Sequence, residues 1–212
     1  MAPKEPSADC ALCPRLAQFR HANAKANPQW HNRPVPSFGP ATARLLIVGL
    51  APGLRGANAT GRPFTGDYAG ELLYLTLLGT GFATGTYGAA RDDGLKLKGA
   101  RITNAVRCVP PQNRPLGAEI RTCGDFLSRE IAALPRLRVI LTLGGVGHNS
   151  TLRSLDIKRK DAPFGHGRKF VTDDGLLILS SYHCSRLNTN TGRLTTEMFK
   201  SVFEAARRYL NQ

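Results

Sequence analysis

Short apolar runs bounded by glycine, proline or polar residues recur along the chain and predict buried strands. The run at residues 44–48 is apolar at nearly every position, which is typical of a strand covered on both faces. Runs at 102–106, 137–143 and 176–181 predict three further strands. None of these runs approaches the roughly 20 apolar residues that a membrane-spanning helix needs.

Helical patterns occupy the segments around these strands. Asp67 is placed to cap a helix whose apolar face carries the leucines at 72, 73, 75 and 77. A short helical arm is expected at 8–27, before a connector rich in proline and asparagine, and another helix at about 118–133. The last helix has a single apolar stripe, formed by Met198, Phe199, Val202, Phe203, Ala206 and Leu210.

The alternation of strands and helices predicts an α/β fold with three layers, α/β/α, around a central, mostly parallel four-stranded sheet. A length of 212 residues favours one domain, with an N-terminal arm at 1–40 and a core at 41–212. In such sheets ligands bind beyond the carboxyl ends of the strands. The residues expected there are 49–53, Asn104, 144–145 and 183–185.

The charge balance narrows the class of partner. Lys and Arg number 29 against 15 Asp and Glu, so the net charge is +14, while 42% of the residues are hydrophobic. A folded, strongly basic domain of this kind most often meets a polyanion, and DNA, RNA or a nucleotide is the leading class. The alternative is a surface charge that only maintains solubility. No leader pattern is evident, so we expect an intracellular, cytoplasmic protein.

Four of the five cysteines are spaced as candidate metal ligands. Cys10 and Cys13 form a C-x2-C pair, and Cys108 and Cys123 form a wider pair later in the chain. Four thiolates suit an iron–sulfur cluster or a structural zinc ion, and the spacing alone favours the cluster only slightly. The alternative is four unrelated buried thiols that pack as small hydrophobic groups.

Two glycine-rich segments are interpreted as turns rather than as nucleotide-binding motifs. Residues 56–61 are followed by Arg62 and Pro63, so the lysine of a phosphate-binding loop is missing. Gly145 and Gly147 follow a predicted strand, but Ser150 replaces the third glycine of a dinucleotide fingerprint. We expect them to let a helix pack close to the sheet.

Four motifs, in this order, resemble those of the uracil-DNA glycosylase superfamily, and of its iron–sulfur family 5 (type b) in particular. They are GLAPG at 49–53, TGRPFTGD at 60–67, ITNAVRCVPP at 102–111 and HCSRLNTNTGRLT at 183–195. The resemblance implies a [4Fe–4S] cluster held by Cys10, Cys13, Cys108 and Cys123. It also implies removal of uracil, and of other deaminated bases, from DNA by base flipping.

The resemblance assigns roles to the residues of these motifs. Gly49, Leu50 and Ala51 would border the base, Phe64 would stack on it and Asn104 would bind its polar edge. His183 would donate to the departing base and Asp67 would orient the attacking water, so these two and Asn104 are the expected catalytic residues. The ordinary alternatives are a core phenylalanine, a turn asparagine, a structural histidine and a helix cap.

Two positions depart from the superfamily pattern. The first motif of its best-known members carries an acidic or amide residue, whereas Leu50 and Ala51 are apolar here, which leaves Asp67 to activate the water. The histidine of the last motif is normally followed by proline, which would stiffen the backbone, but Cys184 occupies that position.

The last motif and a basic segment are the expected DNA contacts. Leu187 is a candidate wedge between bases, a role that Arg186 would share, with Asn188 and Arg193 nearby. Phosphate contacts are expected from Arg193, from Arg168 and Lys169, and from the cluster at 158–160. For that cluster, which comprises Lys158, Arg159 and Lys160, a solvated loop is an equal alternative.

The expected protein is a monomeric, monofunctional DNA glycosylase that leaves an abasic site. No lysine lies within the four motifs, so a Schiff-base intermediate and lyase activity are not expected. The alternatives are a non-catalytic iron–sulfur protein that binds nucleic acid and a zinc-stabilised nucleotide hydrolase.

Overall fold

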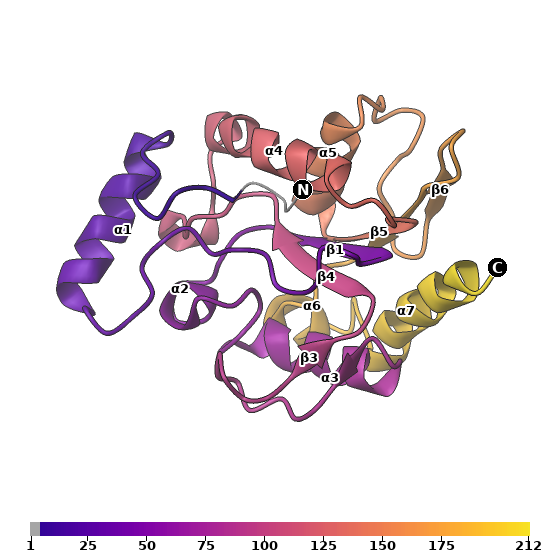
Figure 1. Ribbon diagram of the computed structural model, residues 1–212, viewed down its shortest axis with the longest axis horizontal. Helices are drawn as coiled ribbons and strands as arrows, with labels where there is room; N and C mark the ends of the chain where they lie inside the picture. Colours follow the sequence, from indigo (N-terminus) through magenta and orange to yellow (C-terminus); the bar gives the residue numbers. More distant parts are fainter. Residues whose placement is uncertain (1–4) are drawn as a thin grey trace.

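A five-stranded sheet forms the centre of the computed structural model, which describes residues 5–212 (Figure 1). The strand order is β4-β1-β5-β7-β6, and all neighbours are parallel except β6, which runs antiparallel to β7. The strands span β1 (Leu45–Gly49), β4 (Ala100–Asn104), β5 (Val139–Leu143), β6 (Lys169–Val171) and β7 (Leu177–Ser181).

The four predicted strands are present, and the expected count of four is one too low. The additional strand, β6, has only three residues and is mostly exposed at the sheet edge, so it has no apolar run that would reveal it. The second strand begins and ends two residues earlier than expected, and therefore Asn104 is its last residue.

Helices cover both faces of the sheet, as expected for the three-layer α/β/α class (Figure 1). Leu45 and Ile47 of β1 pack on one face with α3 (Tyr68–Gly79) and α7 (Thr196–Leu210). Leu46 and Val48 point to the other face, which α4 (Gly117–Ala132) and α5 (Gly145–Ser154) cover. Alternate residues of one apolar strand therefore supply two separate cores.

The helix boundaries agree with their predicted signals except in the N-terminal arm, where the helix expected from residue 8 begins at Pro14. Asp67 caps α3 by accepting a hydrogen bond from the backbone N–H of Gly70 at 3.0 Å. Gly147 lets α5 approach the sheet, because a Cβ atom there would lie 2.6 Å from the carbonyl oxygen of Val48. The prediction that Leu75 lies on the apolar face of α3 is wrong, since its side chain is 56% exposed.

The remaining elements are short and lie outside the central sheet. They are α1 (Pro14–Ala26), α2 (Ala57–Thr60), β2 (Ala83–Thr84), β3 (Lys96–Leu97), the 3-10 turn η1 (Pro111–Asn113) and α6 (Arg186–Asn190). Helix α1 belongs to the predicted arm, whose residues 1–4 lie outside the described part of the chain, and it stands to one side of the sheet (Figure 1). Arg15 of α1 binds both carboxylate oxygens of Glu119 in α4, each at 2.7 Å.

One buried ion network braces the sheet against α4. Glu130 of α4 is almost fully buried, and its two carboxylate oxygens accept hydrogen bonds from Arg101 and Arg107. Both arginines also bind Glu5. Every charge of this network is therefore paired.

None of the helices in residues 5–212 is long and apolar enough to cross a membrane.

Candidate active site

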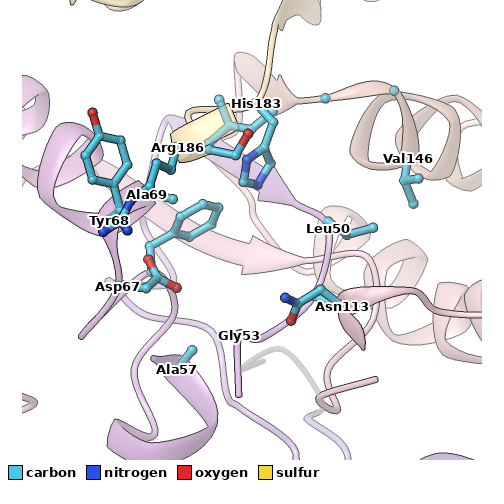
Figure 2. A pocket seen from close by; sticks show the side chains of 16 residues that line it. Leu50, Gly53, Ala57, Asp67, Tyr68, Ala69, Asn113, Val146, His183 and Arg186 are labelled. Carbon is cyan, nitrogen blue, oxygen red and sulfur yellow. The ribbon is translucent and has the colours of Figure 1, made fainter. Parts of the chain in front are cut away.

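A cavity of about 500 Å³ lies beyond the carboxyl ends of β1, β5 and β7, where the strand order predicts a ligand (Figure 2). Its walls are mostly apolar. The segment after β1, the start of α3, the turn η1 and the ends of β5 and β7 provide the lining, which comprises Leu50, Ala51, Gly53, Ala57, Phe64, Asp67, Tyr68, Ala69, Asn113, Leu143, Gly144, Gly145, Val146, His183, Ser185 and Arg186.

Asp67 presents a carboxylate to this cavity from the N-terminus of α3 (Figure 2). Burial raises the pKa of Asp67 above its ordinary value, although the backbone N–H groups of Gly70 and Ala69 partly offset the effect. Neither an ion pair nor a side-chain hydrogen bond to Asp67 occurs among the described residues. The helix cap therefore leaves a partly buried carboxylate oxygen free to interact with a ligand in the cavity.

Phe64 and His183 form the aromatic side of the cavity. Their ring centroids are 5.9 Å apart and the ring planes are inclined by 27°. Phe64 adopts a positive φ of 54°, which is unusual for an aromatic residue and indicates a conformation imposed by its surroundings. Its side chain is only 7% exposed and also packs in the core, so the core and cavity interpretations both apply.

Burial sets the charge of His183. It lowers the pKa of the imidazole to about 4, so the ring is neutral at neutral pH. A neutral imidazole has one N–H donor and one acceptor nitrogen. His183 therefore offers the cavity a polar donor without a full positive charge.

Asn104 and Gly49 are not among the lining residues, but Gly49 adjoins both Asn104 and the lining residue Phe64. Asn104 is 3% exposed, and its Oδ1 atom is buried with no hydrogen-bond partner among the described residues. A Cβ atom on Gly49 would lie 2.4 Å from this oxygen and 2.6 Å from Cζ of Phe64, so only glycine fits between them. Asn104 is therefore held next to Phe64 with an unused acceptor.

Asn113 and Tyr68 line the cavity but were not among the predicted site residues. Asn113 belongs to η1 and faces the cavity from the side opposite Asp67 (Figure 2). Its φ of 56° is a conformation that asparagine tolerates better than most residues. The proline-rich turn just after Cys108 was the available signal, because it fixes a polar residue close to a candidate site.

The sequence comparisons agree with this geometry. The family model described as the uracil DNA glycosylase superfamily matches residues 36–207. The chain belongs to this superfamily. The "Type-5 uracil-DNA glycosylase" of Thermus thermophilus is 42% identical over 205 residues, which cover 94% of this chain and 93% of the relative.

Two relatives of lower sequence identity are also uracil-DNA glycosylases by name and also match most of the chain. The type-5 enzyme of Pyrobaculum aerophilum is 39% identical and covers 93% of this chain and 88% of its own. A "Type-4 uracil-DNA glycosylase" of Saccharolobus solfataricus is 31% identical over 81% of this chain and 75% of the relative. The resemblance that rests on the four motifs is confirmed.

Some of the predicted DNA contacts of this superfamily member lie at the cavity rim, and others lie away from it. Arg186 lines its rim, Leu187 is 72% exposed on α6, and the Asn188 side chain donates to the backbone oxygen of His183 at 2.8 Å. Arg193 lies over the ring of Tyr182, 4.6 Å from its centroid. The three basic residues Lys158, Arg159 and Lys160 are exposed in the segment after α5, and none of them lines the cavity.

The four candidate metal-ligating cysteines of the superfamily member line one small cavity beside α1 and α4. Leu16, Val106 and Phe126 pack around the thiols. Burial raises the pKa of Cys13 to about 11 and that of Cys108 to about 12, and the neighbouring thiols add to both shifts. The backbone N–H of Arg107 donates to Sγ of Cys123 at 3.3 Å.

The donor set of these thiols suits either metal centre expected from the sequence. Four thiolates in one apolar cavity can hold an iron–sulfur cluster, which takes one cysteine per iron, or a tetrahedral zinc ion. Within residues 5–212, no group of three or more Cys, His, Asp or Glu side chains is placed to hold a single metal ion.

Proposed function

We propose that this chain is a monofunctional uracil-DNA glycosylase, which hydrolyses the bond between base and deoxyribose and leaves an abasic site. The observation that carries the proposal is one cavity lined by the partly buried carboxylate of Asp67 and by the aromatic pair of Phe64 and His183. The names of the type-5 relatives support the same activity and uracil as the base.

The target nucleotide leaves the duplex before the reaction, at a cost of a few kcal/mol. The base then stacks on Phe64, while Leu50 and Ala51 exclude water from its other side. The unpartnered Oδ1 of Asn104 accepts a hydrogen bond from an N–H group on the base edge. A buried acceptor with no protein partner favours a ligand that provides the donor.

Bond cleavage leaves negative charge on the base and positive charge on the sugar. The neutral His183 donates its N–H to the base oxygen on which charge accumulates. Asp67 orients the attacking water and accepts its proton, and the carboxylate also stabilises the positive sugar. The raised pKa of Asp67 makes it a stronger base than an exposed aspartate.

The size of the cavity affects which altered bases can enter it. A volume of about 500 Å³ with mostly apolar walls leaves room for the two-ring bases hypoxanthine and xanthine. No lysine lines the cavity in the described part of the chain, so no amine is placed to form a Schiff base. This supports simple hydrolysis without strand cleavage.

Double-stranded DNA would lie across α6 and the rim of the cavity. Leu187, the exposed tip of α6, fills the space that the flipped nucleotide leaves, with Arg186 beside it. Arg193 and the basic segment 158–160 neutralise phosphates. Replacing those three basic residues would then weaken binding to all sequences and lower the salt dependence.

A [4Fe–4S] cluster held by Cys10, Cys13, Cys108 and Cys123 completes the proposal. The common cavity, the apolar shell and the N–H donor to Cys123 support it. The cluster would join the arm that carries α1 to α4 and the segment after β4, and it takes no part in base removal. Iron and sulfide analysis of the purified protein, with Cys108→Ser as the matched variant, tests this part separately. Zinc in place of iron would contradict it.

The activity is tested on labelled duplexes with one uracil opposite guanine or adenine, and with hypoxanthine or xanthine as the altered base. We expect alkali-labile abasic sites from the uracil duplexes. Borohydride should trap no DNA adduct, because no amine attacks the sugar. Protein that binds DNA but releases none of these bases would favour a non-catalytic binding protein instead.

A further inference from the structure

Tyr68 has no part in the chemistry proposed above, yet it connects the start of α3, which carries Asp67, with α6, which follows His183. It follows Asp67 at the start of α3, and its side chain is 37% exposed at the cavity rim. The guanidinium carbon of Arg186 lies 5.2 Å from the centroid of the Tyr68 ring (Figure 2). The hydroxyl of Thr189 donates to the Tyr68 hydroxyl at 3.1 Å. Both partners belong to α6.

Helix α6 has few other means of keeping its position. It has five residues, none of which is buried, and its N-cap Ser185 makes no side-chain capping bond. A helix this short is not stable alone, so contacts with neighbouring segments determine its position. Besides Tyr68, the Asn188 side chain bonds the His183 carbonyl oxygen, and the backbone N–H of Leu194 bonds the Asn188 carbonyl oxygen.

A second link joins the same two segments on the buried side. The thiol of Cys184 donates to the carbonyl oxygen of Ala69 at 3.4 Å, and the Cys184 side chain is fully buried. This inner link holds His183 near Asp67 independently of Tyr68. The outer contacts at Tyr68 hold only α6, which carries Leu187.

We infer that Tyr68 is a positioning residue that holds α6 so that Leu187 can enter a DNA duplex. The inference rests on the proposed glycosylase activity. It assigns Tyr68 to the opening of paired DNA and not to bond cleavage, because the Cys184 link keeps the catalytic side chains in place without it. Its loss should therefore affect substrates whose base must be displaced from a stack more than substrates whose base is already free.

The test compares one uracil in a duplex opposite adenine with the same uracil in a single strand. Tyr68→Ala should lower kcat/KM on the duplex about tenfold, since it removes a cation–π contact and a hydrogen bond. On the single strand the loss should be clearly smaller, about two- to threefold, because Tyr68 also lines the cavity. Leu75→Ala, a substitution of an exposed residue on the same helix, serves as the matched control and should change neither rate.

Two milder variants isolate the hydrogen bond. Tyr68→Phe and Thr189→Ala should each lower the duplex rate about threefold, and the double variant should lower it no further, because both remove the same bond. Equal losses on duplex and single strand, or no loss on the duplex, would overturn the inference. Wild-type protein that is inactive on both substrates would instead refute the proposed activity.

Discussion

Two carboxylates in this molecule, the buried Glu130 and the partly buried Asp67, have opposite surroundings. Burial alone would raise the pKa of Glu130, but the charge of Arg107 and the hydrogen bond from Arg101 bring it below the ordinary value. Burial also dominates at Asp67, where only backbone N–H groups oppose it, and the pKa stays raised. Glu130 is therefore fully compensated, whereas Asp67 is not.

The opposite pKa shifts of Glu130 and Asp67 have opposite effects on the stability of the fold. A lowered carboxyl pKa stabilises the fold above the ordinary pKa, and that stability is lost as the pH falls through the lowered value. A raised pKa has the opposite effect: ionised Asp67 destabilises the fold at neutral pH, and protonation relieves this as the pH falls through the raised value. Carboxylates with perturbed pKa values gather at functional sites, and this supports the role proposed for Asp67.

The largest expected effect concerns stability and comes from Glu130→Gln. It leaves two buried arginines with only the partly exposed Glu5 as counter-charge, and removing one partner of a buried pair costs about 3–5 kcal/mol. Urea unfolding measures the loss. Glu204→Gln is the matched control, because Glu204 pairs with Lys200 at the surface at 3.6 Å, where a pair is worth about 0.5 kcal/mol. Similar losses for both variants would remove the contrast between the two carboxylates.

Asp67→Asn should have the opposite effect to Glu130→Gln, because it should lower the activity and raise the stability. The amide still caps α3 but cannot accept the proton of the attacking water, so single-turnover base release should slow about 10³-fold. The melting temperature at neutral pH should rise, because a partly desolvated charge with no ionic partner has been removed. A melting temperature that falls as it does for Glu130→Gln would show that Asp67 is mainly structural.

Asn104 extends the comparison to an uncharged group. Its Oδ1 has no partner among the described residues, while nearby Thr103 accepts a hydrogen bond from Ser37 at 2.9 Å. Asn104→Ala should slow uracil release about 10- to 100-fold, since leaving the base donor unpaired costs about 1–3 kcal/mol. Thr103→Val is the matched control and should lower stability more than activity. An Asn104→Ala protein with full activity would exclude the side chain from base recognition.

The parts of this site that the sequence could predict lie at strand ends. Leu50, Asn104 and His183 follow or end apolar strands, and the parallel topology brings those ends to one edge. Asp67 was predictable as a cap because it precedes a helical run. Local patterns and one topological rule were enough for these positions.

The missed features depend on contacts between distant parts of the chain. Asn113 enters the cavity from an irregular turn, and no periodicity marks it. The ion network joins Glu5 to Arg101, Arg107 and Glu130, and no local pattern indicates which charges will be buried together. Leu75 shows the converse error, because a leucine can also lie on the exposed face of a helix.

His183 gives the smallest expected effect, because its protonation should not matter near neutral pH. With a pKa near 4, the ring stays neutral and donates one N–H throughout that range. Glutamine also offers a neutral N–H, so the ratio of wild-type to His183→Gln kcat/KM should stay constant between about pH 6.5 and 8.5. Taking the ratio also cancels the loss of activity at low pH that protonation of Asp67 causes in both proteins. If catalysis needed the charged ring at its ordinary pKa, the ratio would fall about tenfold for each pH unit above about 6.5.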